Sequence, residues 1–161
     1  MKCYTILMVG ILFCLLLAGG CSGDSTTGPP RPVPIDQGLT GLVRFWEGNF
    51  QPSISLDGSS GQVHTVRREV RVHELTHLTQ VDELGGGFYT DVRSHLIGSV
   101  WSDESGHFEI PLAPGRYSLF VIENGLHYAN GGDGSGNIWP VEVRPDEVVH
   151  IVFDIDYQAA F

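Results

Sequence analysis

The residues His73-Glu74-Leu75-Thr76-His77 match the pattern His-Glu-x-x-His, which occurs in zinc-dependent proteases. In that chemistry a helix brings both histidines to one metal ion, and the glutamate activates a water molecule. The flanking residues are rich in Val and Thr, which favours a strand. A strand would separate the two histidines by about 13 Å, too far for one zinc ion. A zinc metallopeptidase that uses His73, Glu74 and His77 is therefore kept only as an alternative.

A second candidate site is the glycine-rich segment 130–137, which reads Asn-Gly-Gly-Asp-Gly-Ser-Gly-Asn. Its oxygen-bearing side chains are those of Asn130, Asp133, Ser135 and Asn137. Calcium prefers such oxygens, but the spacing is not that of an EF-hand and the segment holds one carboxylate. The same composition suits a flexible connection between strands. We expect this segment to be the binding loop of the domain, and we assign it no metal or other cofactor.

Four aromatic residues would form a platform for sugars or peptides if they faced solvent. They are Trp46, Trp101, Tyr128 and Trp139. On strands, however, large aromatic side chains more often belong to the core. The sequence contains no phosphate-binding glycine loop before a helix and no nucleophile elbow. These observations favour a binding or structural module over an enzyme.

The elements that must position these residues are β-strands. From residue 40 onward, short runs of β-branched and aromatic residues alternate with Gly, Pro, Asn and Asp, and no long stretch has a helical period. Seven strands are predicted, over residues 40–46, 70–81, 94–101, 107–112, 116–123, 138–143 and 148–157. This spacing is typical of an all-β, immunoglobulin-like or prealbumin-like antiparallel β-sandwich.

The clearest local prediction is a β-hairpin over residues 107–121. Three apolar residues alternate on each side of it: Phe108, Ile110 and Leu112, then Tyr117, Leu119 and Val121. Between them, Pro114 and Gly115 suit the two central positions of a type II turn, in which the glycine takes a positive φ. The pattern therefore predicts two paired strands joined by a tight turn.

Two motifs of this region resemble a known family. They are Asp-x-x-Gly-x-Phe at residues 103–108 and Pro-Gly-x-Tyr at residues 114–117, preceded by Gly-Leu-Val at residues 41–43. Together they resemble the signature of carboxypeptidase regulatory-like domains. The resemblance implies a prealbumin-like β-sandwich without catalytic residues of its own, used as an accessory module beside enzymes and on bacterial envelope proteins. The segment 47–91 makes the stretch between the first strand and the Asp-x-x-Gly motif longer than is usual in this family. The resemblance implies no role for this segment.

The N-terminal segment is predicted to be an export signal. Lys2 is followed by an apolar run over residues 6–17 and by three small residues, 18–20. The run is shorter than the roughly 20 residues that span a bilayer. Residues 18–20 with Cys21 resemble the bacterial lipobox, which implies cleavage after residue 20 and lipidation of Cys21. Ala18 stands where the lipobox usually has Leu, so ordinary secretory cleavage is the alternative.

The expected layout is a signal peptide over residues 1–20, a lipidated Cys21 with a Pro, Gly and Ser tether to residue 38, and one domain over residues 39–161. Two acyl chains are enough for stable attachment to a membrane. Ser22 resembles the residue that follows the cysteine in lipoproteins of the outer membrane. The expected location is therefore the bacterial cell envelope, lipid-anchored, in the outer membrane.

Charge and cysteine content narrow the classes of partner. The chain has 19 acidic and nine basic side chains, a formal net charge of −10, which becomes −11 without Lys2. Such a surface repels polyphosphate, which argues against nucleic-acid binding. The cysteines are Cys3, Cys14 and Cys21, so the domain has no disulfide framework. The expected partner is an envelope protein or glycan, and the second alternative is an accessory subunit of an envelope complex.

Overall fold

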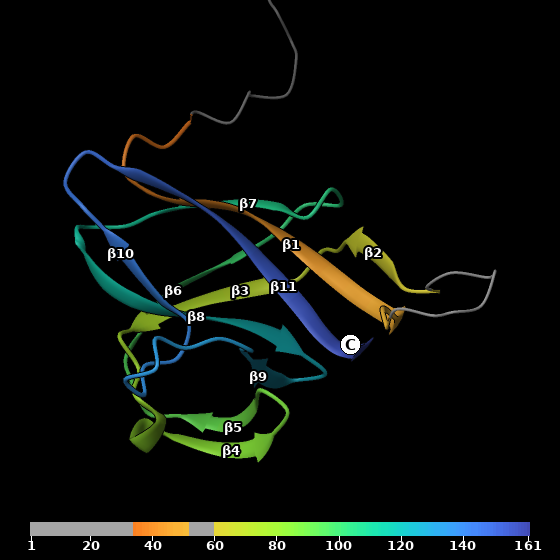
Figure 1. The fold of residues 1–161 in the computed structure, drawn as a ribbon. Helices are drawn as coiled ribbons and strands as arrows, with labels where there is room; N and C mark the ends of the chain where they lie inside the picture. The colour runs from red at the N-terminus through yellow and green to blue at the C-terminus, as the bar shows by residue number, and fades with distance from the viewer. Residues whose placement is uncertain (1–33, 52–59) are drawn as a thin grey trace, which may run out of the picture. The chain divides into compact units, whose positions relative to one another are not determined.

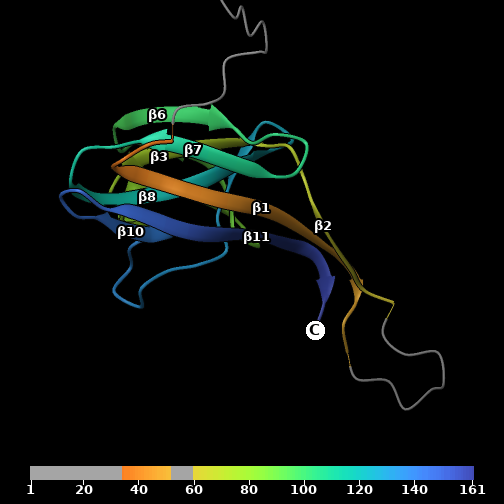
Figure 2. The same cartoon turned by 90° about the horizontal axis from the view of Figure 1, so that it is seen from above.

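The computed structural model describes residues 34–51 and 60–161, which form a sandwich of two β-sheets (Figures 1 and 2). The elements in chain order are β1 (Gly38–Asn49), β2 (Gln62–Thr65), β3 (Glu69–Glu74), the short 3-10 helix η1 (Leu78–Gln80), β4 (Val81–Gly85), β5 (Phe88–Val92), β6 (Leu96–Trp101), β7 (His107–Pro111), β8 (Gly115–Glu123), β9 (Leu126–Tyr128), β10 (Pro140–Val143) and β11 (Val148–Ala160). The all-β sandwich expected from the sequence is confirmed.

The first sheet is built around β1. This strand pairs with β11 on one side, and on the other side with β7 along its first half and β2 along its second half. The β1–β11 pair is parallel, whereas a purely antiparallel sandwich was expected. The second sheet runs β6–β3–β8 and continues beyond β8 with β10 and with β9, β5 and β4. Figure 1 shows β4, β5 and β9 as an extension of this sheet.

Apolar side chains of alternate residues fill the space between the sheets, as the two-residue period of a strand requires. The fully buried members include Leu39, Val43, Phe153 and Ile155 from the first sheet and Val70, Val72, Leu119 and Val121 from the second. Gly41 lies where there is no room for a side chain, because a Cβ atom would come within 2.8 Å of the ring of Phe108. Burying each such Val, Leu, Ile or Phe contributes about 1.5–3 kcal/mol.

The predicted hairpin over residues 107–121 is wrong. β7 pairs with β1 and β8 pairs with β3, so the two strands belong to different sheets. The chain passes from one sheet to the other between them, and Gly115 already lies in β8 without a positive φ. The six apolar residues are all buried, but they face each other across the core. The pattern identified the buried faces correctly and the strand partners incorrectly.

The predicted strand over residues 70–81 is also interrupted. β3 ends at Glu74, and the Thr76 hydroxyl donates to the Glu74 carbonyl over 2.7 Å, which supports a turn there. A capping box follows, in which the His77 side chain accepts from the Thr79 N–H and the His77 N–H donates to the Gln80 side chain. These local hydrogen bonds replace the strand pairing that the Val and Thr content had suggested.

The motifs that resemble the carboxypeptidase regulatory-like signature shape turns and corners of the sandwich. The Asp103 carboxylate accepts hydrogen bonds from the N–H groups of Ser105 and His107, both over 2.9 Å. Gly106 has a φ of +79°, and a Cβ atom there would lie 2.5 Å from the Val43 carbonyl oxygen. Tyr117 donates its hydroxyl to the Ala113 carbonyl over 2.8 Å, in the manner of a tyrosine corner.

The predicted signal peptide, Cys21 and the first part of the tether lie outside the described residues. At the other end of the tether, the Gln37 side chain donates to the Leu112 carbonyl and accepts from the Asp146 N–H. β1 begins at Gly38, so these two residues belong to the sandwich. In the part of the chain that the structure describes, no helix is long and apolar enough to cross a membrane.

Candidate functional site

The His-Glu-x-x-His residues do not form the helix that zinc chemistry requires. His73 is buried at 4% exposure near the end of β3, whereas the next residue, Glu74, is exposed. His77 follows the turn and caps η1. Within residues 34–51 and 60–161, no three His, Cys, Asp or Glu side chains are placed to hold a metal ion. The geometry therefore gives the metallopeptidase alternative no support.

His73 instead belongs to a cluster on the outer face of the second sheet. Its Nδ1–H donates to the Ser94 carbonyl over 3.1 Å, because a carbonyl oxygen can only accept. Its Nε2 is buried and has no hydrogen-bond partner among the described residues. Burial, together with the nearby Arg71 and His95, lowers the pKa of His73. This side chain is therefore held as a neutral ring.

His127 on β9 is the second histidine of this cluster. Its ring centre lies 5.7 Å from that of His73 and 5.6 Å from that of Phe120, a fully buried residue of β8. Its Nε2 accepts from the Arg71 guanidinium over 3.3 Å. Burial, with the charge of Arg71 next in size, lowers the pKa of His127 to about 4. Both histidine rings thus pack edge to face against Phe120.

The glycine-rich segment 130–137 folds back on itself around Asp133. This carboxylate accepts hydrogen bonds from the Ser135 N–H over 2.8 Å, from the Asn137 N–H over 3.2 Å and from the Asn137 side-chain amide over 2.7 Å. The same bonds, with that of the Asn137 side chain first, lower the pKa of Asp133. Arg116 adds an ion pair at 3.8 Å. Asp133 therefore acts as an internal clamp of the loop.

The loop also lies directly against the turn that holds the histidine motif. The Leu78 N–H donates to the Gly136 carbonyl, and the Ile138 N–H donates to the Thr76 carbonyl. Gly136 has a φ of +90°, and a Cβ atom there would lie 2.3 Å from the His77 Nε2 atom. The two segments that the sequence singled out separately therefore meet in the structure. They form one end of a groove.

This groove has a volume of about 800 Å³ and is open to solvent. Its lining combines the glycine-rich loop, the β4–β5 hairpin and the end of β11. Of the four candidate loop residues, Asn130 and Asn137 line it, whereas Asp133 and Ser135 do not. The volume lies in the range of small-molecule and side-chain sites. We take this groove as the candidate functional site.

A second wall of the groove is aromatic and acidic: Tyr128, Tyr157 and Asp156 line it, and Phe88 packs against both tyrosine rings. The ring centres of Phe88, Tyr128 and Tyr157 lie 4.9–5.5 Å from one another. The Tyr128 hydroxyl donates to Asp156 Oδ1 over 2.7 Å and accepts from the Asp156 N–H over 3.3 Å. Burial, with the neighbouring Asp156 next, raises the pKa of Tyr128 far above its ordinary value. Sequence reasoning missed Asp156 and Tyr157, because nothing near them in the chain marks a site.

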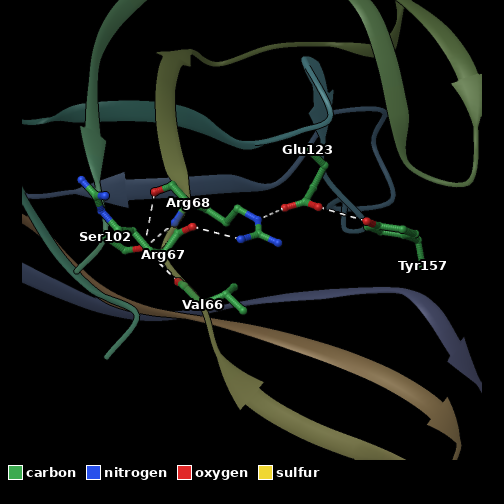
Figure 3. Close-up of polar contacts among 6 residues, drawn as sticks. All are labelled: Val66, Arg67, Arg68, Ser102, Glu123 and Tyr157. Carbon is green, nitrogen blue, oxygen red and sulfur yellow. Dashed lines mark hydrogen bonds and ion pairs between the residues drawn. The ribbon is translucent and has the colours of Figure 1, made fainter. Parts of the chain in front are cut away.

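The Tyr157 hydroxyl is held by the ion pair between Arg68 and Glu123, as Figure 3 shows. Its hydroxyl donates to one oxygen of Glu123 over 3.0 Å, and the other oxygen of Glu123 binds the Arg68 guanidinium. Glu123 is buried at 3% exposure. Ser102 in turn accepts from the Arg68 N–H over 2.8 Å. This chain of bonds links β8 to β11 and sets the position of the Tyr157 ring.

The four aromatic residues considered as a platform are separated in the structure. Trp101 on β6 is 58% exposed and lies 5.3 Å from the Arg67 guanidinium. Trp139 stacks on Phe153 at 4.6 Å, and Tyr128 is fully buried. Trp46 lies near the end of β1, beside Phe50. A shared aromatic surface is therefore not formed by these four residues.

Comparisons with known proteins add no assignment, since no family model, no curated protein and no solved structure matches this chain.

Proposed function

We propose that the protein is a lipid-anchored lipoprotein of the bacterial envelope, and that its β-sandwich is a non-catalytic binding module. The observation that carries the binding role is the groove of about 800 Å³ between the glycine-rich loop and the aromatic wall. Loops carried on a rigid β-scaffold are a common place for recognition. The proposed ligand is an envelope glycan or a protein segment. The anchor at Cys21 holds the binding module on the membrane surface.

Mapping of backbone amides by NMR tests this role directly. The protein is titrated with soluble cell-wall fragments and with pools of short peptides. Binding in the groove would shift the amide signals of residues 83–89, 130–137 and 156–159 and leave those of β6 unchanged. Replacing residues 130–136 with a short Gly-Ser linker should then abolish the shifts at 156–159. Binding that survives this replacement, or no binding by any fraction, would reject the groove as the site.

A second candidate function, an accessory subunit of an envelope complex, is favoured by β11. This strand has 13 residues, and its ladder among the described residues is with β1 alone. The Glu147 carbonyl accepts from the Gly38 N–H of β1. Every second residue of a strand bonds to the same neighbour, so the N–H and C=O groups of Val148 and of every second residue after it point away from β1. The strand contains no Lys or Pro to discourage pairing, and Val152 is 46% exposed. A partner strand would add to this edge, and amide shifts confined to residues 148–154 would identify it.

The anchor itself predicts a simple labelling result. Cells supplied with a labelled fatty acid should label the wild-type protein and not the Cys21→Ser variant, because the thiol is the proposed attachment point. The variant should also move from the membrane fraction to the soluble fraction. The matched control is Cys14→Ser, which removes a thiol of the predicted signal and should leave labelling unchanged. Label that persists in Cys21→Ser would end the lipoprotein assignment.

A further inference from the structure

We propose that the groove selects a positively charged group, the ammonium or guanidinium of a Lys or Arg side chain in a peptide segment. This inference rests on the proposed binding function and names its ligand chemistry. Among the described residues, the charged side chains that line the groove are Glu83 and Asp156, and no Lys, Arg or His of these residues lines it. Charges of one sign around a partly enclosed space repel anions and attract cations. Phosphate and other anionic ligands are thereby disfavoured.

The two carboxylates approach the groove from opposite parts of the sandwich. Glu83 lies on β4, at the irregular pairing between β4 and β5, and its side chain is exposed. Asp156 lies near the end of β11 and is half-buried. Its Oδ1 atom is held by the Tyr128 hydroxyl, which fixes the carboxylate before any ligand arrives. A preformed acceptor loses little conformational entropy on binding, which favours a charge-assisted hydrogen bond.

The aromatic wall supplies the second half of the recognition. Tyr157 is half-buried, and its hydroxyl already donates a hydrogen bond to Glu123. A ligand in the groove would therefore contact the ring and not the hydroxyl. The rings of Phe88 and Tyr128 pack behind it. A cation placed near an aromatic face is attracted by the negative charge density of that face. A carboxylate beside such a face fits a basic side chain better than it fits a neutral sugar.

The size of the groove also fits a side chain on an extended backbone. A volume of about 800 Å³ exceeds what one ammonium group requires and leaves space for the aliphatic stem. Leu78, which is exposed, lines the groove beside the loop and provides an apolar path for that stem. Four glycines of the loop line the groove, so their backbone groups are within reach of the ligand's own peptide bonds. We therefore favour a peptide that carries Lys or Arg over a free small amine.

The test uses three capped tripeptides as probes, Gly-Lys-Gly, Gly-norleucine-Gly and Gly-Glu-Gly, titrated into the whole protein by NMR. Only the lysine peptide should shift the amides around Glu83, Asp156 and the loop. Each of Glu83→Gln and Asp156→Asn should weaken this binding about five-fold, and 0.5 M salt should weaken it further. Asp156→Asn keeps an oxygen for the Tyr128 hydroxyl. Asp146→Asn removes the same charge from an exposed turn and is the matched control, with unchanged binding expected.

The outcomes separate this inference from the binding function beneath it. Equal binding of the lysine and norleucine peptides, or no binding of the lysine peptide, would overturn the cation inference. If cell-wall fragments still shift the groove amides in the Glu83→Gln and Asp156→Asn variants, the binding function stands and the ligand is neutral. If neither the fragments nor the peptides shift these amides, both are rejected.

Discussion

Replacing Arg68 with Met is expected to lower the free energy of unfolding by about 3 kcal/mol, because it leaves the Glu123 carboxylate buried without its cation. Glu123 is only 3% exposed, and its remaining partner would be the Tyr157 hydroxyl. The Arg68 side chain is 32% exposed, so water reaches part of the pair. For this reason we expect the lower end of the range for a broken buried pair.

Urea unfolding at pH 7 measures this loss, and the chain supplies a matched control. Arg67→Met makes the same change one residue earlier, where the guanidinium is exposed and lies over the Trp101 ring. Its expected cost is about 0.5–1 kcal/mol. The double change Arg68→Met with Glu123→Leu should recover most of the loss, since it removes both charges. An Arg68→Met protein within 0.5 kcal/mol of wild type would show that the pair does not hold β8 to β11.

Side-chain alternation predicted which residues are buried better than it predicted their partners. Phe108, Ile110 and Leu112 face the core as expected, but the same alternation suits a hairpin and a crossing between two sheets. The hairpin and the crossing between sheets differ in the direction in which the backbone N–H and C=O groups point after residues 112–114. Alternation of side chains carries no information on that choice.

Two hairpins were missed although the sequence carries clear signals for them. Asn124 and Gly125 have φ values of 52° and 82°, as a type I′ turn requires, and Asn-Gly is a preferred pair for it. Gly85, Gly86 and Gly87 all have a positive φ and join β4 to β5. Recognising the Asn-Gly pair and the run of three glycines as turns would have predicted β4, β5 and β9. The strands themselves are short, so their apolar alternation is weak.

The groove could be predicted only in part. The glycine-rich loop was expected as the candidate binding segment, and Asn130 and Asn137 do line the groove. Asp156 and Tyr157 reach it because β11 runs parallel to β1, and Glu83 reaches it on the β4–β5 hairpin. Such contacts between segments distant in the chain follow from strand order. Local composition does not specify strand order, so the acidic and aromatic wall of the groove could not be predicted from the sequence.

Stability is expected to fall as the pH drops from about 6.5 toward 4, by about 2–3 kcal/mol from the His127 site alone. In the folded protein, burial and then the charge of Arg71 lower the pKa of His127 to about 4, and burial lowers the pKa of His73 in the same direction. An unfolded chain would bind protons at these residues near pH 6.5. Over this range the unfolded state therefore holds more protons, and acid favours unfolding.

The groups around the His73 and His127 rings explain why the folded protein does not stabilise the protonated form of these histidines. Arg71 faces both histidines, and His95 adds to the penalty at His73. Glu69 and Asp91 act in the opposite direction on His127, but Glu69 is already bound to Arg71 through both its oxygens. The Nε2 atom of His73 has no acceptor nearby among the described residues. A proton added there would be buried without a partner.

Unfolding by urea at pH 7.5, 6, 5 and 4.5 measures the effect, and two variants assign it. His127→Gln retains an oxygen for the Arg71 guanidinium but does not titrate, and His73→Asn retains an amide donor for the Ser94 carbonyl. Both should flatten the pH profile relative to wild type. The control is His150→Gln, which removes an exposed histidine outside this cluster and should keep the wild-type pH profile. Carboxylates that titrate in this range are common to all four proteins, so they do not account for a difference between the profiles. A wild-type profile that varies by less than 1 kcal/mol, or that runs parallel to those of both variants, would contradict the assignment of acid sensitivity to this buried pair.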